Sequence, residues 1–233
     1  MKRLIMAVSL IVTSSVANGV EAVSAFTPGA RILFIGDSIT DMNRGRTADP
    51  NHILGHSYVF IIAARQGATF PDARLDFINR GVSGNTVLDL EKRWQKDMLD
   101  LKPDLLSVLI GVNDNTKNVP LDRYEAVYDK LLADARAANP HVKLVLGEPF
   151  GLPVGPKKTD WESWNAGLVK RRAIVAQLAV KYGAALVKLQ HVFDEATQRA
   201  PADYWIWDGV HPTYRGQQLM ADEWERTVRI FWK

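Results

Sequence analysis

The chain has 233 residues, of which 47% are hydrophobic and 24% are charged, so it can form a sizeable core and is neither disordered nor fibrous. Its net charge of +3 is small and spread along the chain, so a nucleic-acid-binding surface is not indicated. The sequence contains no cysteine, which excludes disulfides, a thiol nucleophile, thiolate metal sites and a lipid-modified N-terminal cysteine.

Residues 1–22 have the pattern of a signal peptide. Lys2 and Arg3 precede an apolar run, Leu4–Val12, and small residues that suit a cleavage site follow. The run is shorter than the roughly 20 residues that span a bilayer, although an uncleaved anchor is an alternative. We therefore expect a leader at 1–22 and one exported domain at 26–233, periplasmic or secreted, without stable membrane insertion.

Five short apolar runs, separated by amphipathic stretches, predict buried strands. They are Arg31–Ile35, Leu75–Asn79, Asp104–Ile110, Val142–Leu146 and Ala185–Leu189. Helical spacing of apolar residues predicts helices over Val87–Leu101, Leu121–Ala135, Trp161–Tyr182 and about Thr213–Trp232. This alternation is typical of a single α/β domain with three layers (αβα), in which a doubly wound parallel sheet is covered on both faces.

Polar segments follow the first three predicted strands: GDSIT at 36–40, GVSGN at 81–85 and GVND at 111–114. Since the carboxyl ends of parallel strands share one edge, Ser38, Gly84 and Asn113 are expected to converge there. Asp208 and His211 precede the last helix, which can bring the histidine beside the serine. Taken singly, each segment is also an ordinary turn or helix cap. Together they supply what acyl transfer requires.

The four segments FIGDSIT, NRGVSGNT, IGVND and DGVHP resemble those of the SGNH hydrolases, or GDSL-type esterases, from about Arg31 to the C-terminus. The likeness is greatest to bacterial acetylxylan esterases and related carbohydrate deacetylases. The resemblance implies a flavodoxin-like sheet of order 2-1-3-4-5 and a serine esterase mechanism without a cofactor. One departure is Met42-Asn43, where many members have a glycine, and it bears on loop shape only.

The chemistry assigns a role to each residue of the predicted site. Ser38 needs a base, and His211 is the best candidate, with Asp208 accepting its Nδ1 proton. The backbone N–H groups of Ser38 and Gly84 and the side-chain amide of Asn113 are the expected oxyanion donors. A glycine at position 84 lets the backbone approach the reacting carbon.

Other polar residues fit structural roles better. Asp37 and Asp114 are expected to brace their turns. Asp49 and His52 have the spacing of the predicted dyad, but they lie inside a long loop and rank below it. His52 and His56 are four residues apart without a zinc motif, so no metal is expected.

The substrate is expected to be a small-molecule or oligosaccharide ester, with acetyl groups on a carbohydrate favoured. Trp205 and Trp207 precede the dyad, and they can either form a wall for a sugar ring or acyl chain or pack beneath the dyad. The loops Asp41–Ser57 and Pro149–Asp160 are expected to form a polar rim, which includes Asp41, Asn43, Arg44, Arg46, Lys157 and Lys158.

Two other functions are alternatives: a lysophospholipase or thioesterase of the same fold, and a non-catalytic glycan-binding module. The sequence lacks the glycine-rich signatures of nucleotide-binding enzymes, so that class is discounted. The oligomeric state is not predicted.

Overall fold

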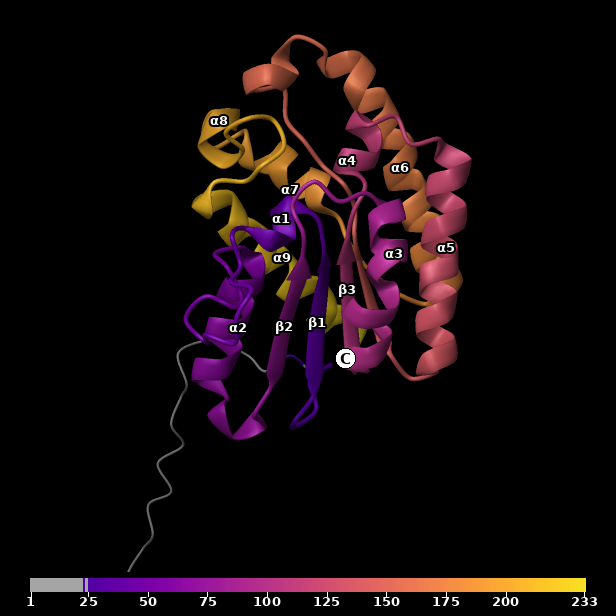
Figure 1. The fold of residues 1–233 in the computed structure, drawn as a ribbon. Coiled ribbons are helices and arrows are strands. Elements are labelled where there is room, and N and C mark those ends of the chain that lie inside the picture. Colours follow the sequence, from indigo (N-terminus) through magenta and orange to yellow (C-terminus); the bar gives the residue numbers. More distant parts are fainter. Residues whose placement is uncertain (1–22, 24) are drawn as a thin grey trace, which may run out of the picture.

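The computed structural model describes residue 23 and residues 25–233, so the predicted signal peptide at 1–22 lies outside the described residues. Five parallel strands form one sheet in the order β2-β1-β3-β4-β5 (Figure 1). The strands are β1 (Arg31–Gly36), β2 (Asp76–Gly81), β3 (Leu105–Leu109), β4 (Lys143–Gly147) and β5 (Ala185–Val187). The predicted α/β class and the strand order implied by the family resemblance are both confirmed.

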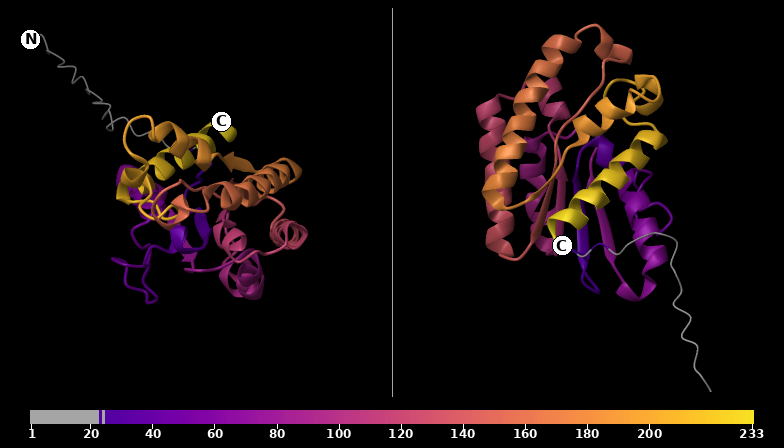
Figure 2. Two further views of the ribbon diagram at one scale, coloured as in Figure 1. Left: turned by 90° about the horizontal axis from the view of Figure 1, so that it is seen from above. Right: turned by 180° about the vertical axis from the view of Figure 1, so that it is seen from behind.

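Helices cover both faces of the sheet, which gives three layers when the molecule is seen from above (Figure 2). One face carries α3 (Val87–Asp97), α5 (Leu121–Ala138) and most of α6 (Trp161–Tyr182). The other carries α2 (Tyr58–Thr69), α7 (Leu189–Ala196) and α9 (Tyr214–Phe231). Shorter helices and 3-10 turns complete the described chain: α1 (Ser38–Asp41), α4 (Val112–Thr116), α8 (Ala202–Trp205), η1 (Pro71–Ala73), η2 (Leu99–Leu101) and η3 (Gly155–Lys158).

Both faces of the sheet are buried at β1, β3 and β4, which explains why these strands are nearly continuous apolar runs, whereas the edge strand β2 is more polar and partly exposed. In β1, Phe34 belongs to the core under α2 and α9, and the next residue, Ile35, belongs to the core under α3 and α5. A polar residue, Ser107, lies in the middle of β3. Its Oγ accepts a hydrogen bond from Trp224 Nε1 at 3.0 Å, so this buried hydroxyl is satisfied.

The register of the three central strands brings their carboxyl ends together. Gly36 of β1 lies beside Gly81 of β2 on one side and Leu109 of β3 on the other. Helix α1 follows β1 directly and packs closely on the end of β2. A Cβ at Gly81 would lie 2.3 Å from the backbone nitrogen of Asp41, so only glycine allows this approach.

Most predicted boundaries agree with the structure. The predicted helix Trp161–Tyr182 has the observed bounds and ends at Gly183, whose φ of +58° suits glycine. The helix predicted through Leu101 stops at Asp97, because Met98 leaves helical geometry, and a 3-10 turn follows. The last predicted strand stops at Val187, since α7 begins at Leu189.

The described chain starts against the last helix. The ring of Phe26 lies 6.1 Å from that of Trp224 and 5.8 Å from that of Phe77. None of the helices described for residues 25–233 has the length and apolarity that crossing a membrane requires.

Candidate active site

Ser38 occupies the first position of α1, at the carboxyl end of β1. The turn between them is formed by Asp37, which caps the helix: its Oδ1 accepts a hydrogen bond from the Ile39 N–H at 3.0 Å. An N-capping aspartate satisfies an N–H group that the helix leaves unpaired. The strand-to-helix junction therefore fixes the direction in which Ser38 leaves the sheet.

His211 and Asp208 lie beside Ser38, although they are 170 or more residues away in the sequence. Ser38 Oγ lies 2.8 Å from His211 Nε2, and His211 Nδ1 lies 2.7 Å from Asp208 Oδ2. A carboxylate only accepts hydrogen bonds, so Nδ1 carries the proton and Nε2 is left to accept from the serine hydroxyl. The structure thus brings the three predicted residues into one hydrogen-bonded chain.

The segment that carries the dyad is held in a tight turn. Ile206 and Pro212 form an antiparallel bridge, and Asp208 Oδ1 accepts hydrogen bonds from the N–H groups of Val210 and His211. Burial by itself would raise the pKa of Asp208, but the hydrogen bonds from the His211 ring and from these N–H groups outweigh it and lower the pKa. The carboxylate therefore stays ionised while it orients the histidine.

The same contact sets a pH dependence. The hydrogen bond with Asp208 raises the pKa of His211 above its ordinary value of 6.5, against the effect of partial burial. A general base must be neutral, so kcat/KM is expected to fall as the pH drops through the raised pKa, about tenfold per pH unit below it. Measuring kcat/KM for p-nitrophenyl acetate between about pH 5 and pH 9 tests this. An acid midpoint below 6.5 in a protein that remains folded would contradict it.

Gly84 follows β2 in the loop Ser83–Asn85, which we call the oxyanion loop after the role expected for Gly84. Its φ is +80°, a conformation that side-chain-bearing residues rarely adopt. A Cβ at this position would have no atom of the described structure within 4 Å. Backbone conformation, and not crowding within the protein, is therefore the reason why glycine suits this position.

Asn113 lies in α4, just after β3, and reaches the oxyanion loop. Its Nδ2 donates a hydrogen bond to the backbone carbonyl of Asn85 at 3.0 Å. An amide nitrogen has two hydrogens, so this bond orients the group, and the second hydrogen is the one that the predicted oxyanion role would use. The geometry is compatible with the predicted role of Asn113 as a donor.

Asn113→Ala is expected to lower kcat by about 10²- to 10³-fold with a modest change in KM, because an oxyanion donor acts mainly in the transition state. Steady-state kinetics with p-nitrophenyl acetate measure both constants. Asn139→Ala is the matched control, because it also removes an Nδ2 hydrogen bond to a backbone carbonyl, that of Pro103, but at the opposite end of the sheet, and it is expected to leave both constants unchanged. A large rise in KM with an intact kcat would assign Asn113 to ground-state binding instead.

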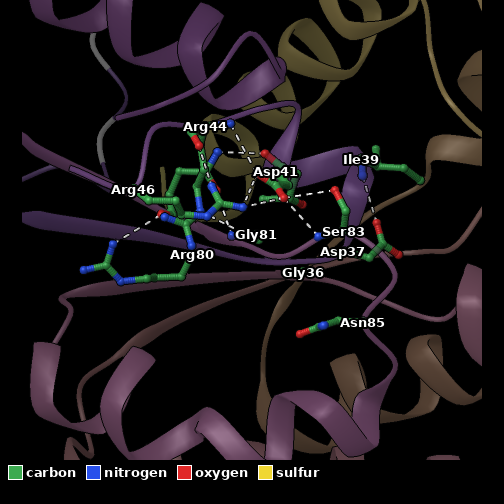
Figure 3. Close-up of polar contacts among 12 residues, drawn as sticks. Gly36, Asp37, Ile39, Asp41, Arg44, Arg46, Arg80, Gly81, Ser83 and Asn85 are labelled. Carbon is green, nitrogen blue, oxygen red and sulfur yellow. Dashed lines mark hydrogen bonds and ion pairs between the residues drawn. The ribbon is translucent and has the colours of Figure 1, made fainter. Parts of the chain in front are cut away.

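Asp41 corrects one sequence-based expectation. It was expected in the polar rim, but it is only 3% exposed, and it lies three residues after Ser38 on α1. Its Oδ2 accepts hydrogen bonds from the N–H and Oγ of Ser83, each at 3.0 Å, and it also pairs with Arg46 (Figure 3). Asp41 therefore ties the helix of the candidate nucleophile to the oxyanion loop. In the sequence, the signal for this role of Asp41 is its position only three residues after Ser38.

Two further buried carboxyl groups, Asp37 and Asp114, flank the site: Asp37 caps its own turn as expected, whereas Asp114 bonds to a neighbouring segment. Asp114 Oδ1 accepts from the N–H of Val87 at 2.9 Å and so holds the start of α3. Burial raises the pKa of Asp37 to about 7 and that of Asp114 to about 6. Asp37 also acts on the site electrostatically, because its charge contributes to the raised pKa of His211.

The two tryptophans before the dyad differ in position. Trp205 is 8% exposed and belongs to the core, so the structure favours the packing role and not a wall for the substrate. Trp207 is 64% exposed, and its ring lies 6.5 Å from that of His211 at an interplanar angle of 26°. Only Trp207 therefore presents a face to solvent beside the candidate base.

A second aspartate–histidine pair lies in the long loop after α1. His52 Nδ1 is 2.6 Å from Asp49 Oδ2, and both side chains are largely open to solvent. The histidine that contacts Ser38 is His211 and not His52. Among the residues that the structure describes, no group of three or more His, Asp or Glu side chains could hold a metal ion.

Comparison with known proteins gives consistent similarities. Residues 34–219 match the GDSL-like lipase/acylhydrolase family. An acetylxylan esterase of Geobacillus stearothermophilus is 32% identical over 220 residues, which are 88% of this chain and 96% of that protein. The solved structure of Axe2, an acetylxylan esterase from Geobacillus stearothermophilus, matches with a TM-score of 0.77 at 30% identity. The match covers 88% of this chain and 96% of the Axe2 chain. LAE5, an α/β hydrolase enzyme from the metagenome of Lake Arreo in Spain, has a TM-score of 0.80 at 29% identity and covers 90% of this chain and 99% of its own.

Proposed function

The chain belongs to the GDSL-like lipase/acylhydrolase family and is a carboxylic ester hydrolase of that type, and on this basis we propose that it removes acetyl groups from a carbohydrate through an acyl-enzyme on Ser38. The observation that carries the mechanism is the continuous chain from Ser38 Oγ to His211 and Asp208, with contacts of 2.8 and 2.7 Å. A glycan-binding module without catalysis has no need of this arrangement.

In the proposed reaction, Ser38 Oγ attacks the ester carbonyl carbon while His211 Nε2 takes the hydroxyl proton. The carbonyl oxygen becomes an oxyanion, which accepts hydrogen bonds from the N–H groups of Ser38 and Gly84 and from the Asn113 amide. His211 then protonates the departing alcohol oxygen, and the C–O bond breaks to leave acetyl-Ser38. Water, deprotonated by His211, then attacks the acetyl carbon. The bond between that carbon and Ser38 Oγ breaks, His211 returns the proton to Oγ, and acetate leaves.

Because an acetyl group is small, we assign most of the binding energy to the alcohol side of the substrate. One methyl group contributes little, since a buried CH₂ is worth about 0.8 kcal/mol. Contacts with the sugar must therefore supply the rest. Trp207 offers an exposed ring face beside His211, and Arg46 is an exposed polar side chain of the loop that starts at Asp41. The ring face can pack against a sugar ring, and the guanidinium of Arg46 can donate hydrogen bonds to hydroxyl oxygens, which an alkyl chain lacks.

A lipid-directed esterase would need an apolar groove that leads to the serine. The structure contains an apolar cavity of about 570 Å³, but it lies between the carboxyl-terminal parts of α6 and α9 and is lined by residues such as Val180, Ile230 and Phe231. None of the residues that line it belongs to the candidate site. This cavity therefore does not favour the lysophospholipase or thioesterase alternative.

A substrate panel tests the proposal. We expect kcat/KM for p-nitrophenyl esters to fall from acetate through butyrate and octanoate to palmitate, and acetate to be released from acetylated xylo-oligosaccharides. The Ser38→Ala variant is the control for release that does not depend on the site. Rising efficiency with chain length, together with no acetate release, would move the assignment to a lipid-directed esterase.

Export is part of the same proposal and is supported by the charged and apolar pattern of residues 1–22. Expression of the full chain in a bacterial host, followed by N-terminal sequencing of the protein in the periplasmic fraction, tests it. We expect a new N-terminus within residues 18–26, after Ala17, Ala22 or Ala25. An intact Met1 in the cytoplasmic fraction alone would contradict export.

A further inference from the structure

The oxyanion loop must be fixed relative to Ser38, because hydrogen-bond donors stabilise an oxyanion only when they are preorganised. Asp41 holds Ser83 at one end of this loop. At the other end, the backbone carbonyl of Asn85 is occupied by Asn113. These contacts leave the side chain of Asn85 as a separate attachment point.

Arg93, in the second turn of α3, occupies that attachment point. Its Nε donates to Asn85 Oδ1 at 2.8 Å, and its Nη1 donates to the backbone carbonyl of Arg80 at 2.8 Å. Its Nη2 donates to the backbone carbonyl of Gly36 at 3.1 Å, and Nη1 also pairs with Asp97 Oδ2 at 2.9 Å. One planar guanidinium thus binds the end of β1, the end of β2 and the oxyanion loop.

Each of the three acceptors is close to the proposed chemistry. Gly36 is two residues before Ser38, Arg80 is at the end of the strand that leads into the oxyanion loop, and Asn85 is the residue after Gly84. The Arg93 side chain is only 16% exposed, so these bonds are shielded from competing water. Burial lowers the pKa of Arg93, which the neighbouring Asp97 opposes, and the arginine remains charged.

We propose that Arg93 is a positioning residue that holds the oxyanion loop at the correct distance from Ser38. It touches no reacting atom and acts through Asn85, whose backbone carbonyl orients Asn113. The proposal rests on the oxyanion role given above to Gly84 and Asn113. Lysine cannot replace the arginine, because an ammonium has no rigid fork to span three acceptors.

If Arg93 had a purely structural role, replacing another arginine with a similar set of hydrogen bonds would have the same effect. Arg136, on α5, donates to the backbone carbonyls of Pro140, Val142 and Tyr182, and these lie around the start of β4, at the opposite end of the sheet. Arg136→Lys therefore removes a comparable set of hydrogen bonds far from the candidate site. It is the matched control for Arg93→Lys.

The test compares Arg93→Lys, Asn85→Ala and Arg136→Lys by melting temperature and by kcat and KM for p-nitrophenyl acetate. Arg93→Lys is expected to lower kcat about 10- to 100-fold with KM changed less than about threefold, as for a misplaced catalytic group. Asn85→Ala removes one acceptor of Arg93 but keeps the backbone carbonyl, so it is expected to reproduce part of the loss. Arg136→Lys is expected to lower the melting temperature and keep kcat.

Combining Arg93→Lys with Asn113→Ala provides a readout that a change in stability alone would not affect. If Arg93 acts through the oxyanion donors, Arg93→Lys is expected to cost much less in the Asn113→Ala background than in the wild type. Equal costs in the two backgrounds, a loss confined to KM, or equal losses of kcat in Arg93→Lys and Arg136→Lys would overturn the proposal. Failure of the proposed function is distinguishable: Ser38→Ala would retain turnover if the acyl-enzyme were wrong, and the substrate panel would show no acetate release if the substrate were wrong.

Discussion

Ser38→Ala is expected to lower kcat for p-nitrophenyl acetate by about 10⁶-fold, which is the scale of loss when a serine hydrolase is deprived of its nucleophile. The alanine variant retains the proposed oxyanion donors and the proposed substrate contacts, so weak turnover above the rate in water is expected to remain. KM is expected to change little. Ser38 is only partly buried, and alanine differs from serine by the loss of the hydroxyl oxygen alone, so the fold is expected to be preserved.

The control for this experiment is Ser163→Ala, which removes an exposed hydroxyl at the start of α6, outside the candidate site. Its kinetic constants are expected to match those of the wild type. A Ser38→Ala variant with turnover within about tenfold of the wild type would mean that another group attacks the ester.

Asp208→Asn is expected to lower kcat by about 10⁴-fold, on the scale known for serine proteases whose triad aspartate is replaced by asparagine. The asparagine can donate to Nδ1, which favours the tautomer whose proton lies on Nε2, and that nitrogen can no longer take the Ser38 proton. The substitution also removes the carboxylate that raises the pKa of His211. The acid limb of the residual activity is therefore expected to shift to lower pH.

Asp49→Asn is the matched control, because Asp49 and His52 have the same spacing and a comparable contact of 2.6 Å. This substitution is expected to leave kcat and its pH profile unchanged. If Asp49→Asn lost turnover while Asp208→Asn kept it, the loop pair would have to be the one that serves the nucleophile.

Much of this arrangement could be predicted from the sequence. Strands β1, β3 and β4 are nearly continuous apolar runs because both of their faces are buried. Parallel strands end at one edge, which places Ser38, Gly84 and Asn113 together. The position of the dyad followed from the helix that comes after His211, whose start at Thr213 was predicted within one residue of the observed Tyr214.

Other features could not be predicted, because they depend on contacts between distant segments. Trp205 and Trp207 are two residues apart in the sequence, yet one is buried in the core and the other is exposed. The burial of Asp41 depends on how closely α1 packs against the end of β2, which the local sequence does not specify. Arg93 has the pattern of an ordinary helical surface residue, and its three acceptors come from different strands and loops.

The most direct test of the account is covalent labelling of Ser38. A serine-directed organophosphorus reagent, followed by intact-mass analysis and peptide mapping, is expected to give one adduct per chain, located on the peptide that contains Ser38. The adduct is expected to be absent in Ser38→Ala and to form much more slowly in Asp208→Asn. An adduct of unchanged mass and rate in Ser38→Ala would contradict the proposed acyl-enzyme.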